Sequence, residues 1–148
     1  MRIKISKIGI LLLIILLTST NCYGRHIFRE EVYQAYWCGK HNGVMEYVLN
    51  DKTRVDCLTE NYAVEVDFAP KWAECIGQSL HYGHKTHKQP ACLLIMENPE
   101  KDIRYLKRLR YDAYKLGIKT FTIKPDKIHN FILEEITKDF PNCGMNGE

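Results

Sequence analysis

The sequence lacks several features that would direct its interpretation elsewhere. It has no C-x-x-C pair, which argues against a zinc ribbon or a thioredoxin-type redox motif. It has no internal repeat and no low-complexity linker, and its 148 residues fit one domain. An apolar fraction of 45% and a charged fraction of 26% are those of an ordinary globular protein, which excludes disordered and collagen-like chains.

A long apolar run is also missing. The longest run, Ile8–Leu17, is about half the length of the roughly 20 residues that a transmembrane helix needs. Basic residues precede this run, and small and polar residues follow it as far as Gly24. This layout is that of a secretory signal peptide. We therefore expect an exported protein, periplasmic or secreted, with no stable membrane span after cleavage at Gly24.

This assignment divides the chain into three parts. They are a signal peptide (1–24), a folded domain (25–140) and a flexible tail (141–148). A lipoprotein with Cys22 as the lipidated residue is an alternative, but residues 19–21 lack the usual leucine and small residues before such a cysteine. An uncleaved N-terminal anchor is a second alternative.

An excess of charge of one sign is missing from the predicted mature chain. The whole sequence has a formal charge of +3, from 21 Lys and Arg against 18 Asp and Glu. Arg2, Lys4 and Lys7 account for all of that excess, since residues 1–24 contain no acidic residue. The remainder is formally neutral, so a polyanionic partner must be argued from a local site and not from net charge.

Five cysteines remain after the predicted cleavage. Because the number is odd, at least one is unpaired or bonds to another chain. Cys57, Cys75 and Cys92 lie within apolar stretches, where free cysteine behaves as a small core residue. One disulfide involving Cys38 or Cys143 remains open.

Hydrophobic periodicity predicts an α/β fold. Two short turns, at 50–52 and 60–61, separate three strands that should form an antiparallel meander. Later strands alternate with amphipathic helices, which predicts crossovers, a mixed sheet and helices on both of its faces. The expected elements are helix 29–37, strands 44–49, 53–59 and 62–68, helix 71–83, strand 91–96, helix 101–116, strand 118–123 and a helix from 126.

Acidic residues align across the predicted meander. Glu65 and Asp67 share a face of their strand because they are two residues apart. A two-residue turn at 60–61 places Asp56 opposite Glu65, and a three-residue turn at 50–52 places Glu46 opposite Asp56. Such a row is costly without a cation, because like charges repel, and hard divalent cations such as Mg²⁺ take oxygen ligands. The alternative is a set of exposed strand carboxylates paired with Lys52 or Arg54.

The helix after the third strand adds polar groups beside this row. Lys71, Glu74, Gln78 and Tyr82 follow helical spacing and therefore share one stripe. The first turn of this helix should lie near Glu65, because the helix directly follows that strand.

These stretches resemble the PD-(D/E)XK nuclease superfamily over roughly Glu30–Ile123. The residues that carry the resemblance are R-V-D-C-L-T-x₃-A-V-E-V-D (54–67) followed by K-W-A-E-C-I-G-Q-S-L-H-Y (71–82). The resemblance implies a restriction-endonuclease-like αβββαβ core and hydrolysis of DNA phosphodiesters that depends on Mg²⁺ (or Mn²⁺). It also implies that Asp56 and Glu65 are catalytic metal ligands, with Glu46 added from the row, and that Gln78 and Tyr82 support the metal ligands or contact DNA.

The chain departs from the family pattern at one position. Asp67 stands where the E-x-K motif has lysine, and Lys71, on the following helix, is the natural replacement. The glutamate that the family carries on its first helix could be Glu30 or Glu31, although Glu46 fits the carboxylate row better.

Two other function classes remain open at this stage. The first is a catalytically inactive module on the same fold that binds nucleic acid or another partner. The second is an exported structural protein whose acidic row is only surface.

Two further groups of side chains are weaker candidates for a site. His81, His84 and His87 are a candidate zinc site if the helix extends through them. A later helix has a basic face that could touch phosphate if it borders the site. Its residues are Arg104, Lys107, Arg108, Arg110 and Lys115. The oligomeric state remains open.

Overall fold

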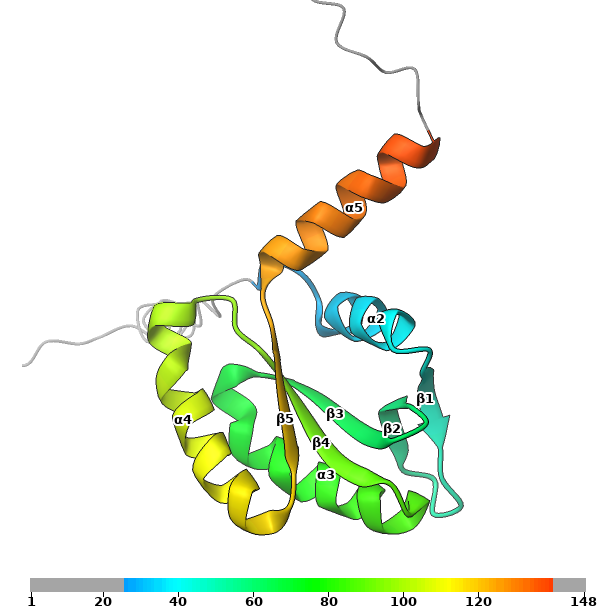
Figure 1. Ribbon diagram of the computed structural model, residues 1–148, viewed down its shortest axis with the longest axis vertical. Helices are drawn as coiled ribbons and strands as arrows, with labels where there is room; N and C mark the ends of the chain where they lie inside the picture. Colours follow the sequence, from blue (N-terminus) through cyan, green and yellow to red (C-terminus); the bar gives the residue numbers. More distant parts are fainter. Residues whose placement is uncertain (1–25, 140–148) are drawn as a thin grey trace, which may run out of the picture.

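A computed structural model describes residues 26–139, with side chains as far as residue 134. The predicted signal peptide and the predicted tail lie outside the described residues. The elements, in chain order, are α2 (Glu30–Lys40), β1 (Val44–Val48), β2 (Arg54–Leu58), β3 (Tyr62–Phe68), η1 (Ala69–Lys71), α3 (Trp72–Thr86), β4 (Gln89–Ile95), α4 (Pro99–Leu116), β5 (Lys119–Ile123) and α5 (Pro125–Asp139). Figure 1 shows the strands as one sheet with helices on either side.

The five strands lie in chain order, β1-β2-β3-β4-β5. The first three are antiparallel neighbours, whereas β4 and β5 run parallel to β3. Short turns permit the antiparallel pairs, and α3 and α4 provide the crossovers that parallel pairs require. The predicted α/β class with a mixed, five-stranded sheet is therefore confirmed.

Helices cover both faces of the sheet. On one face Tyr33 and Trp37 of α2 pack with Val64 and Val66 of β3 and with Ile128 of α5. On the other face, residues of α3 and α4 pack with β4. The members of this second cluster include Cys75, Leu106, Leu109, Cys92 and Leu94. None of the helices in the described part of the chain is long and apolar enough to cross a membrane.

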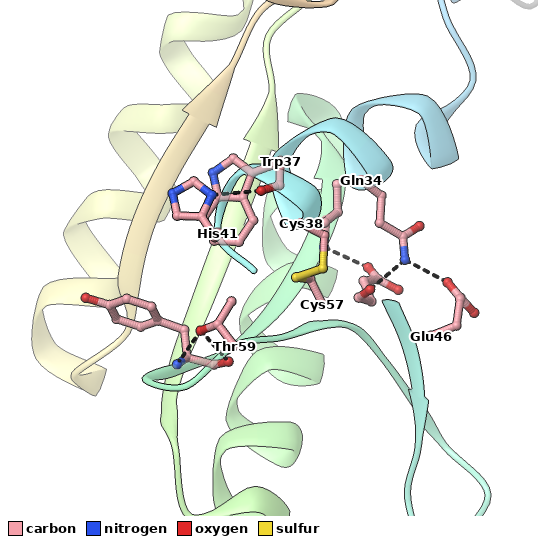
Figure 2. Close-up of a disulfide and its surroundings, with 10 residues drawn as sticks. Gln34, Trp37, Cys38, His41, Glu46, Cys57 and Thr59 are labelled. Atoms are coloured by element: carbon pink, nitrogen blue, oxygen red, sulfur yellow. Dashed lines mark hydrogen bonds between the residues drawn. A yellow bond between two sulfur atoms is a disulfide. The ribbon is translucent and has the colours of Figure 1, made fainter. Parts of the chain in front are cut away.

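A disulfide joins α2 to β2. Cys38 and Cys57 are bonded, with their Cα atoms 5.7 Å apart, and both are fully buried (Figure 2). Gly43 passes directly over the two sulfur atoms, where a Cβ atom would collide with both. Cys57 is thus not the lone core residue that its apolar neighbours suggested, while Cys75 and Cys92 are buried and free, as predicted.

Helix α3 is longer than its sequence predicts. Gly83 and the polar residues after it suggested an end near 83, but the helix continues to Thr86 and ends where His87 has φ 54°. Gly83 instead lies close to Pro90 of β4, because a Cβ atom at this position would be 2.9 Å from two side-chain atoms of Pro90. The absence of a side chain lets α3 and β4 meet at this point.

Candidate functional site

The site begins where strand β2 parts from β3. The observed pairs Cys57↔Val64 and Leu58↔Ala63 have the predicted register, which puts Asp56 opposite Glu65. The backbone pairing of β2 and β3 stops before Asp56 and Glu65. Beyond that point the Asp56 carboxylate, instead of a backbone carbonyl, accepts a hydrogen bond from the Val66 N–H at 2.7 Å. The carboxyl group of Asp56 is therefore fixed in place by the backbone of β3.

Strand β1 brings Glu46 to the same place. The pairs Met45↔Cys57 and Tyr47↔Val55 have the predicted register, so Glu46 lies opposite Asp56. The backbone of Glu46 has φ 51°, an uncommon conformation for a residue other than glycine. Its carboxylate pairs with Arg54 at 3.0 Å and is 43% exposed. An exposed carboxylate paired with Arg54 was the alternative that the sequence left open, and this is what the structure shows for Glu46.

Gln34 of α2 hydrogen bonds to both β1 and β2. The sequence did not predict it as part of the site. Its amide nitrogen donates to the Asp56 carbonyl at 2.7 Å and to the Glu46 carboxylate at 2.8 Å (Figure 2). Its place in the sequence beside Tyr33, Trp37 and Cys38, which form the buried side of α2, was the available signal.

Glu65 and Asp67 lie on the α3 face of β3, and both are buried, with relative exposures of 5% and 3%. One oxygen of each carboxyl group, Oε2 of Glu65 and Oδ2 of Asp67, is buried without a hydrogen-bond partner. Buried polar atoms are nearly always paired, so two orphaned carboxyl oxygens on one strand face require an explanation.

Burial and mutual repulsion raise the pKa values of these acids. Burial, followed by the charges of Asp56 and Asp67, raises the pKa of Glu65 far above its usual range. Burial raises the pKa of Asp56 to about 6, although the hydrogen bond from Val66 opposes the shift. Burial raises the pKa of Asp67 to about 7 against the opposing charge of Lys71. At neutral pH this cluster therefore retains protons that a solvated carboxyl group would release.

Lys71 lies next to Asp67. Its Nζ is 3.4 Å from Asp67 Oδ1, and its side chain is about half exposed. Burial lowers the pKa of Lys71, but the charges of Asp67 and Glu30 outweigh it and raise the pKa overall. The ammonium group therefore sits between the buried acids and solvent.

Glu30, the first residue of α2, is the acid that the sequence-based site passed over in favour of Glu46. Its charge raises the pKa values of Asp56 and Asp67 and acts on Lys71 as well. Burial raises the pKa of Glu30 itself. The start of the first helix thus adds an acid to the cluster. Its position at that start was the signal in the sequence.

An open cleft of about 720 Å³ has Asp56 in its lining. Its walls come from the start of α2, the β1–β2 hairpin and α3. The residues around it are Glu30, Glu31, Glu46, Lys52, Thr53, Arg54, Asp56, Gln78 and Tyr82. Glu65, Asp67 and Lys71 are not among the residues that line it. The structure thus places Glu46, Asp56, Gln78 and Tyr82 on the cleft.

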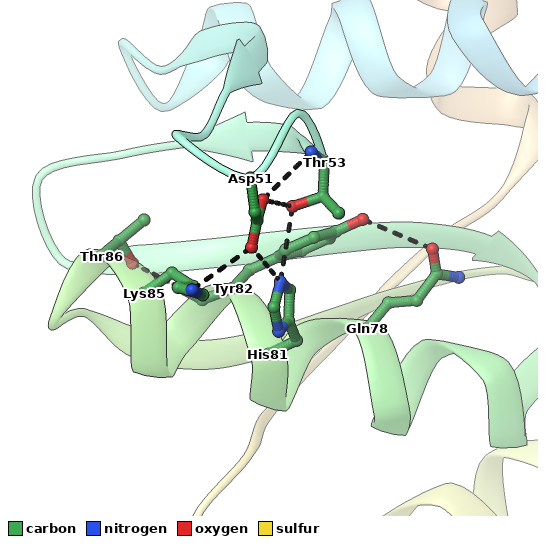
Figure 3. Close-up of polar contacts among 7 residues, drawn as sticks. All are labelled: Asp51, Thr53, Gln78, His81, Tyr82, Lys85 and Thr86. Atoms are coloured by element: carbon green, nitrogen blue, oxygen red, sulfur yellow. Dashed lines mark hydrogen bonds and ion pairs between the residues drawn. The ribbon is translucent and has the colours of Figure 1, made fainter.

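Gln78 and Tyr82 form a pair on the α3 wall. The Tyr82 hydroxyl donates to Gln78 Oε1 at 3.4 Å (Figure 3). Burial, followed by the charges of Glu65 and Asp56, raises the pKa of Tyr82 to about 12. The hydroxyl thus keeps its proton and serves as a donor near the acids.

Polar contacts of Asp51 connect the tip of the β1–β2 hairpin to α3. Asp51 accepts from Thr53, binds His81 Nε2 at 3.0 Å and pairs with Lys85 Nζ at 3.4 Å (Figure 3). His81 is one of the three histidines proposed for zinc, and here its partner is a hairpin aspartate. Within residues 26–139, no group of three or more His, Cys, Asp or Glu side chains has an arrangement that could hold a metal ion.

No family model matches the chain, and comparisons with curated proteins and with solved structures gave no match. The PD-(D/E)XK resemblance therefore remains an expectation that rests on the motif residues.

Proposed function

We propose that the chain is an exported nuclease-like enzyme with a restriction-endonuclease-like core that hydrolyses DNA phosphodiesters with Mg²⁺ or Mn²⁺. The observation that carries the proposal is the meeting of Asp56 and Glu65 at the end of the β2–β3 ladder, beside an open polar cleft. The motif order and the αβββαβ order of elements support the same conclusion.

The acids suit a hard divalent cation. Asp56 lines the cleft and is only partly buried. Glu65 lies opposite Asp56 in the β2–β3 register and is buried, and one of its carboxyl oxygens has no hydrogen-bond partner. Asp56 and Glu65 would hold the ion, and Glu46 or Glu30 could complete the set, because all of these ligands are carboxylate oxygens. The side chains would have to turn toward one another, since the described residues do not already form a group of three. When bound, Mg²⁺ supplies a Lewis acid and lowers the pKa of a bound water.

The remaining residues have roles that their own chemistry supports. Lys71, beside Asp67, would place a positive charge near a phosphate and hold a water molecule. Lys52 and Arg54, at the rim of the cleft, would position a phosphodiester backbone. The Gln78–Tyr82 pair would donate hydrogen bonds from the α3 wall.

The buried disulfide supports export. Disulfides persist in oxidising compartments and are rare in the cytosol, so the Cys38–Cys57 bond agrees with the signal peptide that the sequence predicts. Extracellular or incoming DNA would then be the substrate available to such an enzyme.

The test is a cleavage assay with the purified chain. Plasmid, linear and single-stranded DNA are incubated with Mg²⁺ or Mn²⁺, and with a chelator. We expect cleavage that requires the metal and is lost in Asp56→Ala and Glu65→Ala. Glu60→Gln, in the exposed β2–β3 turn, is the matched control and should cut normally. Absence of cleavage in every DNA form, or equal cleavage by Asp56→Ala, would contradict the enzymatic proposal.

A second candidate is a catalytically inactive module that binds nucleic acid or another partner. It is favoured by Asp67, which replaces the motif lysine and pairs with Lys71, the only nearby substitute that the sequence suggested. Calorimetry separates the two candidates. An enzyme should bind Mg²⁺ or Mn²⁺ and lose that binding in Asp56→Ala, whereas an inactive module should bind neither metal.

A further inference from the structure

Two buried thiols flank Glu65 on the α3 face of the sheet. Cys75 of α3 and Cys92 of β4 are both free and have no exposed surface. They belong to one apolar cluster, and the elements that carry them, α3 and β4, follow each other in the chain. The proposed nuclease function makes no use of them.

The hydrogen bonds of the two thiols place each of them near the other cysteine. Cys75 Sγ donates to the Glu65 carbonyl at 3.5 Å, and Glu65 is the direct neighbour of Cys92 in the β3–β4 pairing. Cys92 Sγ donates to Ser79 Oγ at 3.5 Å, and Ser79 lies one helical turn after Cys75. Each thiol therefore touches a residue adjacent to the other cysteine.

We propose that Cys75 and Cys92 are a disulfide pair that joins as a second structural disulfide when the chain folds in an oxidising compartment. The bond would fasten α3 to β4 immediately behind Glu65. Because α3 also carries Gln78 and Tyr82, it would fix the α3 wall of the cleft relative to the sheet. The proposal does not depend on nuclease activity.

The chemistry is thiol–disulfide exchange with a small disulfide such as oxidised glutathione. The Cys75 thiolate attacks one glutathione sulfur and releases one glutathione, which takes up a proton. The Cys92 thiolate then attacks the Cys75 sulfur and releases the second glutathione. Two protein thiols are oxidised to one disulfide, and one glutathione disulfide is reduced to two thiols.

Burial sets the time at which this exchange can occur. An oxidant cannot reach either thiol in the folded chain, because both side chains are fully buried. The bond must therefore form before α3 closes over the sheet, and a chain folded in the reduced state should stay reduced until it is unfolded.

The test is a disulfide map of the full-length chain. The chain is refolded from denaturant in glutathione buffers of increasing oxidising strength, and remaining thiols are alkylated after denaturation. Peptides are then mapped without reduction. The buffer at which Cys38–Cys57 is fully bonded is the internal reference. We expect a Cys75–Cys92 cross-link at that point, and no cross-link when oxidant is added only after folding under reducing conditions.

Variants assign the bond. Cys75→Ser should leave Cys92 as an alkylated thiol, Cys92→Ser should do the same for Cys75, and Cys143→Ser should leave the cross-link intact. Complete alkylation of Cys75 and Cys92 in a chain that contains Cys38–Cys57 would overturn the proposal. A cross-link of either residue to Cys143 or to a second chain would also overturn it.

Discussion

The Oδ2 atom of Asp56 accepts a hydrogen bond from the Val66 backbone N–H at 2.7 Å, where a strand carbonyl would otherwise be the acceptor. The same aspartate lines the open cleft. A single carboxyl group therefore completes the sheet with one oxygen and presents the other to the site. This double role means that changes at Asp56 affect both stability and chemistry, and the two effects must be measured separately.

We predict that Asp56→Ala and Asp56→Asn differ in stability. Alanine leaves the Val66 N–H without its partner, and an unsatisfied buried donor costs about 1–3 kcal/mol. Asparagine keeps an acceptor and removes a charge that repels Glu65, so its free energy of unfolding should stay close to that of the wild type. Denaturant titration at neutral pH measures both variants. Equal losses in the two variants would show that the hydrogen bond to Val66 contributes nothing.

Asp67 should make stability fall as pH rises. Burial raises its pKa from the ordinary 3.8 to about 7, so between these pH values the folded chain holds a proton that the unfolded chain has released. Stability therefore decreases with increasing pH in that window, by up to about 1.4 kcal/mol per pH unit for one proton. Asp67→Asn cannot titrate and should lose this part of the slope.

The check is the free energy of unfolding of Asp67→Asn at several pH values across the window. Glu60→Gln is the control and should keep the wild-type slope, because Glu60 is exposed in the β2–β3 turn. A wild-type slope in Asp67→Asn would mean that Asp67 is ionised throughout the window.

The registers of the acidic row were predictable because tight turns determine which residues face each other. The turns at 50–52 and 60–61 place Glu46 opposite Asp56 and Asp56 opposite Glu65, and both registers are observed. Alternation along β3 likewise placed Glu65 and Asp67 on one face. Local periodicity was sufficient for these features.

Features that depend on distant contacts were not predictable in this way. The partner of Cys38 follows from how α2 lies on β2, which no local pattern encodes. Gln34 and Glu30 join the site for the same reason. Gly83 was misinterpreted as a helix end because its true reason, the approach of Pro90, comes from a different element.

Two glycines of α3 should respond oppositely to alanine. Nothing lies within 4 Å of a Cβ at Gly77, so Gly77→Ala should stabilise the helix by up to about 1 kcal/mol. A Cβ at Gly83 would lie 2.9 Å from Pro90, so Gly83→Ala should cost about 1–3 kcal/mol through overpacking. Thermal and denaturant unfolding of the pair measure the difference. Stabilisation by both substitutions would mean that α3 and β4 do not approach each other at Pro90.

Cation binding should stabilise the fold, because a divalent ion would compensate the buried carboxylate charges that Asp56, Glu65 and Asp67 otherwise avoid by retaining protons. A ligand that binds only the folded chain raises its stability by about 2.7 kcal/mol at a concentration 100 times its dissociation constant. We expect Mg²⁺ or Mn²⁺ to raise the melting temperature of the wild type and of Glu60→Gln, and to leave Asp56→Asn and Glu65→Gln unchanged. Equal shifts in all four proteins would assign the effect to ions bound elsewhere, and no shift in any of them would favour the inactive module.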